Sequence, residues 1–225
     1  MFQRSSRAWK KITVSAKVAD GQLLCIATTL PPSDLKDFSK DNFPDAFVFR
    51  RTQINGSGNP KQEIVITGKA IRQALFSVPM ERMLRTQGDA VCLDSSKSSN
   101  CNCKRCQWFG SVDKRGLISV ADAPVRDAKT VVLNRIQLCE HSMQNMNLFT
   151  GEFLAKGNFS FDILIDRAEE ADSVNLAEKI LQICKEMKET APPGWYRVGG
   201  TSTCTGQVEV EDFTEKKSAQ SVKSA

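Results

Sequence analysis

Four cysteines near the middle of the chain offer the clearest chemistry in the sequence. They are Cys92, Cys101, Cys103 and Cys106, and they fall within fifteen residues. Structural zinc prefers thiolate ligands, and four thiolates fill its tetrahedral shell and leave no position open for a substrate. The spacing from Cys103 to Cys106 is the two-residue knuckle common in such sites. The cluster therefore predicts a structural zinc site, with Lys104 and Arg105 offsetting the negative charge of the thiolates.

The stretch between the first two cysteines cannot become ordered by burying side chains. Asp94 to Asn100 contains no apolar residue, so metal binding would supply the free energy that folds it. Two disulfides, or a chance cluster of thiols, are the alternatives. No hydrophobic signal peptide precedes the cysteines, which argues against an oxidising compartment and predicts a cytoplasmic protein.

The composition sets limits on fold and partners. With 225 residues, of which 40% are hydrophobic, the chain can form one large domain with insertions. No apolar run is long enough to span a bilayer. The net charge of +5 permits binding to a polyanion without requiring it. His141 is the single histidine, which leaves few options for acid–base catalysis near neutral pH.

Hydrophobic periodicity predicts the elements that position the cysteines. Alternating patterns indicate strands at 11–19, 117–122, 158–166 and 207–212, and a hairpin within 130–153. A first helix is expected from about Lys69, with Pro79 kinking or ending it. A second helix is expected from Asp172 or Ser173 to just before Pro192.

The order of these elements predicts the fold class. Without the insert and the hairpin, it reads strand, helix, strand, strand, helix, strand, which is the ferredoxin-like pattern of many RNA-binding domains. We therefore expect an α+β protein with a ferredoxin-like or RRM-like palm, forming a single domain over residues 1–213. The palm would carry a zinc-binding insert (87–115) and a thumb β-hairpin (126–157), and 214–225 would be a disordered tail.

Four passages, in this order, carry a resemblance to a known family. They are Ile66–Arg72, the segment from Cys106-Gln-Trp-Phe-Gly-Ser111 to Asp122, the hairpin from Asn134 to Glu152, and the glycine-rich loop from Gly199 to Glu209. Together they resemble the RAMP superfamily of CRISPR proteins, and within it the backbone subunit of type III effector complexes. Gln22–Ala27 lacks the histidine and glycines usual in that family after the first strand, which indicates a divergent branch.

The resemblance implies a subunit that polymerises along a guide RNA and presents it to target RNA in antiviral defence. Its partners would be guide RNA (crRNA), target RNA, other copies of itself in a filament and other CRISPR effector subunits, with no membrane. Contacts would go to phosphates and sugars, because base pairing reads the sequence. The residues expected to contact RNA are Arg50, Arg51, Gly68, Lys69, Arg72, Arg126, Arg135, Met143, Gly199, Gly200, Thr201 and Ser202.

Whether the chain cuts RNA stays open at this point. The resemblance implies Asp45 as the catalytic residue, where a carboxylate would help Mg²⁺ or Mn²⁺ position the 2′-hydroxyl of the RNA for in-line attack. The alternative is that Asp45 is one of several solvated acids in the same loop. Three other functions remain: a non-catalytic scaffold serving a separate nuclease, a guide-processing endoribonuclease with His141 as general base, and a zinc-ribbon interaction domain without an RNA role.

Overall fold

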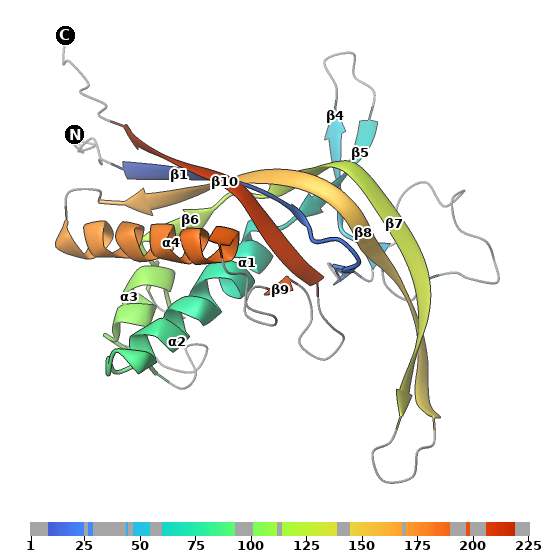
Figure 1. The fold of residues 1–225 in the computed structure, drawn as a ribbon, viewed down its shortest axis with the longest axis horizontal. Coiled ribbons are helices and arrows are strands. Elements are labelled where there is room, and N and C mark those ends of the chain that lie inside the picture. Colours follow the sequence, from blue (N-terminus) through green and yellow to red (C-terminus); the bar gives the residue numbers. More distant parts are fainter. Residues whose placement is uncertain are drawn as a thin grey trace, which may run out of the picture.

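An eight-stranded sheet forms the centre of the molecule in this computed structural model (Figure 1). The structure describes residues 9–24, 27–28, 44, 47–54, 60–92, 101–111, 114–138, 145–167, 170–189, 197–198 and 206–218. The strands are β1 (Trp9–Val18), β2 (Ala27–Thr28), β3 (Phe47–Val48), β4 (Arg50–Ile54), β5 (Pro60–Ile66), β6 (Ile118–Val120), β7 (Ala123–Leu138), β8 (Asn145–Asp166), β9 (Arg197–Val198) and β10 (Gly206–Ser218). The helical segments are α1 (Gly68–Ile71), the π-helical η2 (Arg72–Ser77), α2 (Val78–Thr86), α3 (Lys104–Phe109) and α4 (Ala171–Glu189).

The strands of the sheet follow the order β4-β5-β7-β8-β1-β10-β9, and β6 also pairs with β8. All strand pairs among the described residues are antiparallel. The short strands β2 and β3 form a separate pair. Beyond the sheet, β7 and β8 continue together as a long, curved hairpin (Figure 1). We call this hairpin, residues 126–138 and 145–157, the arm.

The strand β1 lies inside the sheet, between β8 and β10. Its residues alternate strictly between buried and half-buried positions, as the sequence pattern predicted. Ile12, Val14 and Ala16 point into the core, whereas Lys11 and Lys17 lie on the other face. The helices gather on the buried side of the sheet, so this face and the helical stripes form one core (Figure 1).

Two helical runs cover this face. The second predicted helix is confirmed as α4, in which Ala177, Ile180, Cys184 and Met187 are all buried. The other run passes through α1, η2 and α2 without stopping at Pro79, which was expected to kink or end it. Proline lacks an N–H and clashes with the carbonyl of the preceding turn. The wider π-helical turn immediately before it accommodates this residue within the run.

The prediction of a ferredoxin-like or RRM-like palm is wrong. It placed an insert and a hairpin on a small palm, whereas the structure has an eight-stranded antiparallel sheet. The predicted thumb hairpin and the predicted strand at 158–166 are not separate elements, because β8 runs unbroken over 22 residues through Gly157. The hairpin β4–β5, which was not expected, extends the same sheet beyond β7.

The first residues of the predicted disordered tail (214–225) belong to a strand instead. The strand β10 continues to Ser218, and Thr214 and Lys216 pair with Thr13 and Lys11 of β1. A polar strand is stable here because its backbone completes the ladder of β1, whatever the polarity of its side chains.

None of the helices in the described part of the chain has both the length and the apolar character needed to cross a membrane.

Candidate metal centre and predicted RNA-contact residues

The structure brings the four cysteines of the predicted zinc site together. Their sulfur atoms all lie within 4.8 Å of one another. The Sγ of Cys92 lies 3.3 Å from that of Cys106 and 3.7 Å from that of Cys103. A disulfide bond requires about 2.05 Å, and all four cysteines are free thiols, so the disulfide alternative is not what the structure forms.

The spacing of the sulfurs fits a tetrahedral metal ion. With metal–sulfur bonds of about 2.3 Å, four ligands around zinc lie about 3.8 Å apart, which is close to the separations observed. Cys106 is buried and the other three are half-buried, so the cluster is largely screened from water. The four cysteines can therefore hold a metal ion such as zinc.

The local sequence explains why three of the cysteines converge. Cys103 is the N-cap of the short helix α3, and Cys106 lies one turn further along. The helix ends at Gly110, whose φ of +87° is open to glycine and strained for other residues. Gly116 lies against the backbone of Trp108 and Phe109, where a Cβ atom would clash. These two glycines fold the chain back onto α3 and fix the knuckle.

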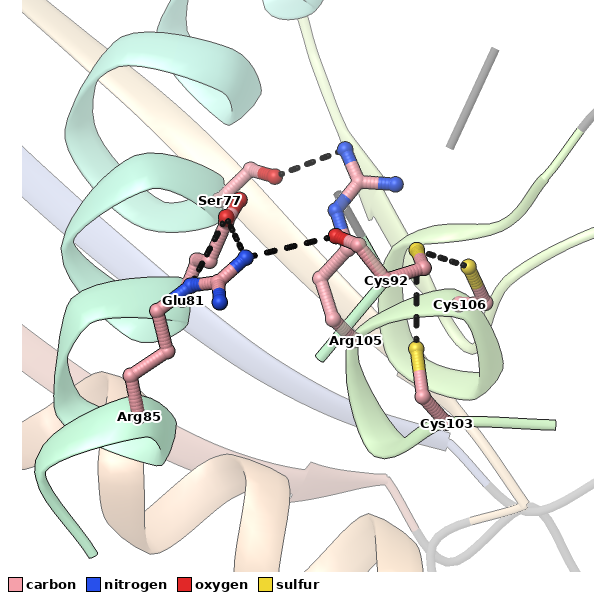
Figure 2. A network of polar contacts seen from close by, with 7 residues as sticks. All are labelled: Ser77, Glu81, Arg85, Cys92, Cys103, Arg105 and Cys106. Atoms are coloured by element: carbon pink, nitrogen blue, oxygen red, sulfur yellow. Dashed lines mark hydrogen bonds and ion pairs between the residues drawn. The ribbon is translucent and has the colours of Figure 1, made fainter. Parts of the chain in front are cut away.

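A salt bridge from Lys104 and two hydrogen bonds, from Arg85 and Arg105 (Figure 2), tie the metal centre to the long helical run and the turn after it. Lys104 Nζ lies 2.9 and 3.1 Å from the two carboxylate oxygens of Asp89. Arg85 donates to the main-chain carbonyl of Cys92 at 3.4 Å and is itself paired with Glu81. Arg105, which is 8% exposed, donates to Ser77 Oγ at 3.4 Å. The metal centre is therefore packed against η2 and α2.

The thiols differ in acidity. Although burial raises the pKa of Cys103, hydrogen bonds from the backbones of Cys92 and Cys106 and from the Cys101 side chain bring it down to about 7. Burial, together with hydrogen bonds to the neighbouring thiols, raises the pKa of Cys106 to about 12. A metal ion must displace the protons of such thiols, so its binding is expected to weaken as the pH falls.

Arg50 is not free to contact RNA in this structure. It forms a two-pronged pair with Glu152, with Nη1–Oε2 and Nη2–Oε1 distances of 2.7 and 2.5 Å. Glu152 is 1% exposed and also accepts a hydrogen bond from the backbone N–H of Val48. Burial raises the pKa of Glu152, but the hydrogen bonds from Arg50 and Val48 outweigh it and hold the pKa below its usual value. This pair fastens β3 and β4 to the base of the arm.

Three other residues predicted to contact RNA, Gly68, Arg51 and Arg72, also have partners within the protein. The N–H of Gly68, predicted to bind phosphate, donates to Asp122 Oδ1 at 2.8 Å. Arg51 Nη2 lies 3.4 Å from Glu63 Oε2, and its Nη1 lies 3.8 Å from Asp122 Oδ2. Arg72 donates to the main-chain carbonyl of Phe109 at 3.4 Å. Lys69 is exposed on the surface.

A group of cationic side chains lies where the arm leaves the sheet, and only one of them, Arg126, was predicted from the sequence to contact RNA. Arg126, Lys129 and Lys156 are all exposed, and Lys129 and Lys156 are direct cross-strand partners. The register shifts on both sides of Lys129, which marks a bulge with Asp127 at a φ of +52°. The sequence carries no signal for the Lys129–Lys156 pairing, because it depends on this bulge.

Several predicted residues lie outside the part of the chain that the structure describes. They are Asp45, His141, Met143, Gly199, Gly200, Thr201 and Ser202. The backbone of Arg135 belongs to β7, but its side chain is likewise outside the description. The predictions for these residues remain predictions.

The fold and site define an antiparallel-sheet protein with one helix-covered face, a four-cysteine knuckle and a cationic arm. No protein-family model matches the chain. A stretch of 123 residues is 26% identical to the dual-action ribosomal maturation protein DarP of Histophilus somni strain 2336, and the match to DarP of strain 129Pt has the same identity and length. The stretch covers 55% of this chain and 66% of the relative's length. At this identity and coverage, the match does not place the chain in that family.

Proposed function

We propose that this chain is a guide-RNA-binding backbone subunit of a CRISPR ribonucleoprotein complex, which assembles with copies of itself along the guide. The four passages that resemble the RAMP backbone subunit support this proposal. The observation that carries it is the group of exposed cations at the base of the arm, which we call the arm-base cations: Arg126, Lys129 and Lys156.

Two of the arm-base cations, Lys129 and Lys156, repel each other in the isolated protein. Like charges directly opposite on neighbouring strands are destabilising, and Lys129 and Lys156 are placed in this way. Among the described residues, neither lysine has a carboxylate within ion-pair distance. A polyanion crossing the base of the arm would relieve the repulsion, and phosphate contacts of this kind hold any RNA sequence equally well.

The rest of the sheet surface offers a contrast. On the face away from the helices, Lys11 lies 2.6 Å from Asp162, and Lys17 lies 3.2 Å from Glu209. These cations are already neutralised by neighbouring acids, so this face is a poorer surface for a polyanion. The charge distribution therefore favours the arm over the middle of the sheet as the place where RNA binds.

The metal in the cysteine cluster is proposed to be zinc with a structural role. Four protein sulfurs complete its shell, and binding free energy of this kind becomes folding free energy. The cluster lies beside α2 and α3, at the opposite end of the molecule from the arm (Figure 1), so it would stabilise the subunit rather than touch the bound RNA.

Binding of unrelated single-stranded RNAs, followed by fluorescence anisotropy across a range of salt concentrations, tests the RNA-binding role. Replacing the arm-base cations by alanine should weaken binding at low salt by about tenfold or more, and reduce the salt slope by about two. The matched control removes three exposed cations elsewhere, Arg167, Lys185 and Lys216. Equal losses in both triple variants, or no binding by the wild type at low salt, would contradict the proposal.

Cleavage of target RNA at Asp45 belongs to the same proposal, with Mg²⁺ or Mn²⁺ as the metal. An Asp45→Ala variant in the assembled complex should stop cutting a matched target while still binding it. Cutting at an unchanged rate would instead support the non-catalytic scaffold, serving a separate nuclease subunit. Processing of precursor RNA that is lost in His141→Ala would favour the guide-processing endoribonuclease.

A role in ribosome maturation is a second candidate, and its support is the partial match to DarP. Sequencing the RNA that co-purifies with the intact assembly separates the two. Short RNAs bearing a common repeat-derived end would support the CRISPR role, whereas enriched ribosomal RNA would overturn it in favour of the second candidate.

A further inference from the structure

Cys92 is the cysteine of the cluster whose placement needs explanation. Cys101, Cys103 and Cys106 come from one short stretch around α3, and local folding brings them together. Cys92 reaches the cluster from a different segment, which follows the C-terminus of α2. Something other than the knuckle must therefore direct Cys92 toward the other three sulfurs.

The chain turns sharply after α2 and heads toward the knuckle. Gly88 has a φ of +80°, and its N–H donates to the carbonyl of Arg85 at 3.1 Å. The N–H of Asp89 donates to the carbonyl of Leu84 at 2.9 Å, which closes the last turn of the helix. This turn sets the direction of the segment from Asp89 to Cys92.

Two charged side chains then hold the segment at both ends. Lys104, from α3, binds both carboxylate oxygens of Asp89, at 2.9 and 3.1 Å. Arg85, from α2, donates to the main-chain carbonyl of Cys92, and its guanidinium is oriented by Glu81 at 3.0 and 3.3 Å. Figure 2 shows Arg85 reaching from its helix to Cys92, whose sulfur points toward Cys103 and Cys106.

We propose that Arg85 and Lys104, with their partners Glu81 and Asp89, are positioning residues for the metal site, since they hold Cys92 in place as its fourth ligand. None of them has an atom in the sulfur cluster, so they act through the backbone of the 89–92 segment. A ligand held in place before the metal arrives loses less conformational entropy on binding, and groups that orient ligands typically change metal affinity by about ten- to a hundredfold. The inference rests on the proposed zinc site.

The test measures the zinc affinity of the full chain by competition with a chromophoric chelator, in the absence of RNA. Arg85→Gln and Asp89→Asn should each lower the affinity by about tenfold. Lys104→Arg, which keeps the charge opposite Asp89, should retain most of it. Arg167→Gln provides the control, because it breaks an exposed ion pair with Glu170, just before the start of α4 and remote from the cysteines in sequence.

Cobalt substitution shows whether these residues position a ligand or are ligands themselves. At saturating Co²⁺, Arg85→Gln and Asp89→Asn should keep the visible bands of a four-sulfur tetrahedral site, whereas Cys92→Ser should change them. The melting temperatures of the metal-free variants should stay close to that of the wild type, since these charged pairs are partly exposed.

The outcomes distinguish the two proposals. A wild-type chain that binds neither Zn²⁺ nor Co²⁺ would overturn the zinc site itself. A wild type that binds zinc, with Arg85→Gln and Asp89→Asn binding equally well, would overturn the positioning role alone. A fall in affinity that matches a fall in the stability of the metal-free protein would also overturn it, because the residues would then be stabilising the fold in general.

Discussion

At the scale of single residues, the buried pair of Arg50 and Glu152 makes the sharpest prediction. Arg50→Met would leave the Glu152 carboxylate, which is 1% exposed, without its cation. We expect a loss of about 3–5 kcal/mol in the free energy of unfolding, measured by urea denaturation. Arg51→Met, at the neighbouring and more exposed position, should cost about 1 kcal/mol or less.

A double variant separates charge from packing. In Arg50→Met with Glu152→Met, no charge remains buried, so part of the lost stability should return. A double variant as unstable as Arg50→Met alone would show that the pair contributes through shape rather than through its charges.

The same carboxylate predicts a dependence on pH. The pKa of Glu152 in the folded protein lies below its ordinary value of 4.5. The stabilisation that the ionised Glu152 gives to the folded protein is therefore fully present above that value, and it is lost as the pH falls through the folded-state pKa. Urea titrations at decreasing pH should show the stability difference between wild type and Glu152→Gln constant near neutrality and narrowing below pH 4.5. A difference that does not change with pH would contradict this role.

At the scale of elements, Gly68 decides how the first helix meets the sheet. A Cβ at this position would collide with the carbonyl of Val120, in β6. Gly68→Ala should therefore cost about 3 kcal/mol or more, measured by urea denaturation, whereas alanine at an unhindered helical site would stabilise the protein. Lys69→Ala, one residue further and exposed, should change stability by less than about 0.5 kcal/mol. A stabilised Gly68→Ala variant would show that the two elements can move apart.

Local patterns predicted most of the helices and strands, but they missed several bounds, the hairpin β4–β5 and the contacts between elements. The cysteine cluster was predictable because its members lie close in sequence and their spacing suits one metal. The pairing of Arg50 with Glu152 was not, since the partners are 102 residues apart and Arg50 alone suggests an exposed cation. The positioning contacts of Arg85 and Lys104 were missed because they depend on the turn at Gly88.

The error in the fold class has a similar cause. The thumb hairpin was predicted to end at Gly157 and a separate strand to begin at Asn158, but β8 passes straight through this position. The structure shows another reason for a glycine there, because a Cβ would collide with the side chain of Val125 on β7. A glycine required by packing between strands cannot be told from one that ends a strand by sequence alone.

At the scale of the whole molecule, the arm should be separable from the core. Asn134 and Thr150 are cross-strand partners, and their side chains are hydrogen-bonded at 2.8 Å. Replacing residues 135–149 by an Asn-Gly turn should leave cooperative thermal unfolding within a few degrees of the wild type, because the arm has already left the core before this point, where Val131 and Leu133 are 37% and 41% exposed. Loss of cooperative unfolding would show that the outer arm belongs to the folding unit.

The position of β1 between β8 and β10 has a consequence for biosynthesis. Thr13 is bonded to Asp162, 149 residues further along, and both ladder partners of β1 are translated long after it. Until they emerge, an alternating apolar strand has two unsatisfied edges, and pairings so distant in sequence form slowly. Nascent chains of this protein should therefore depend on a chaperone that shields β1 until synthesis has passed β10.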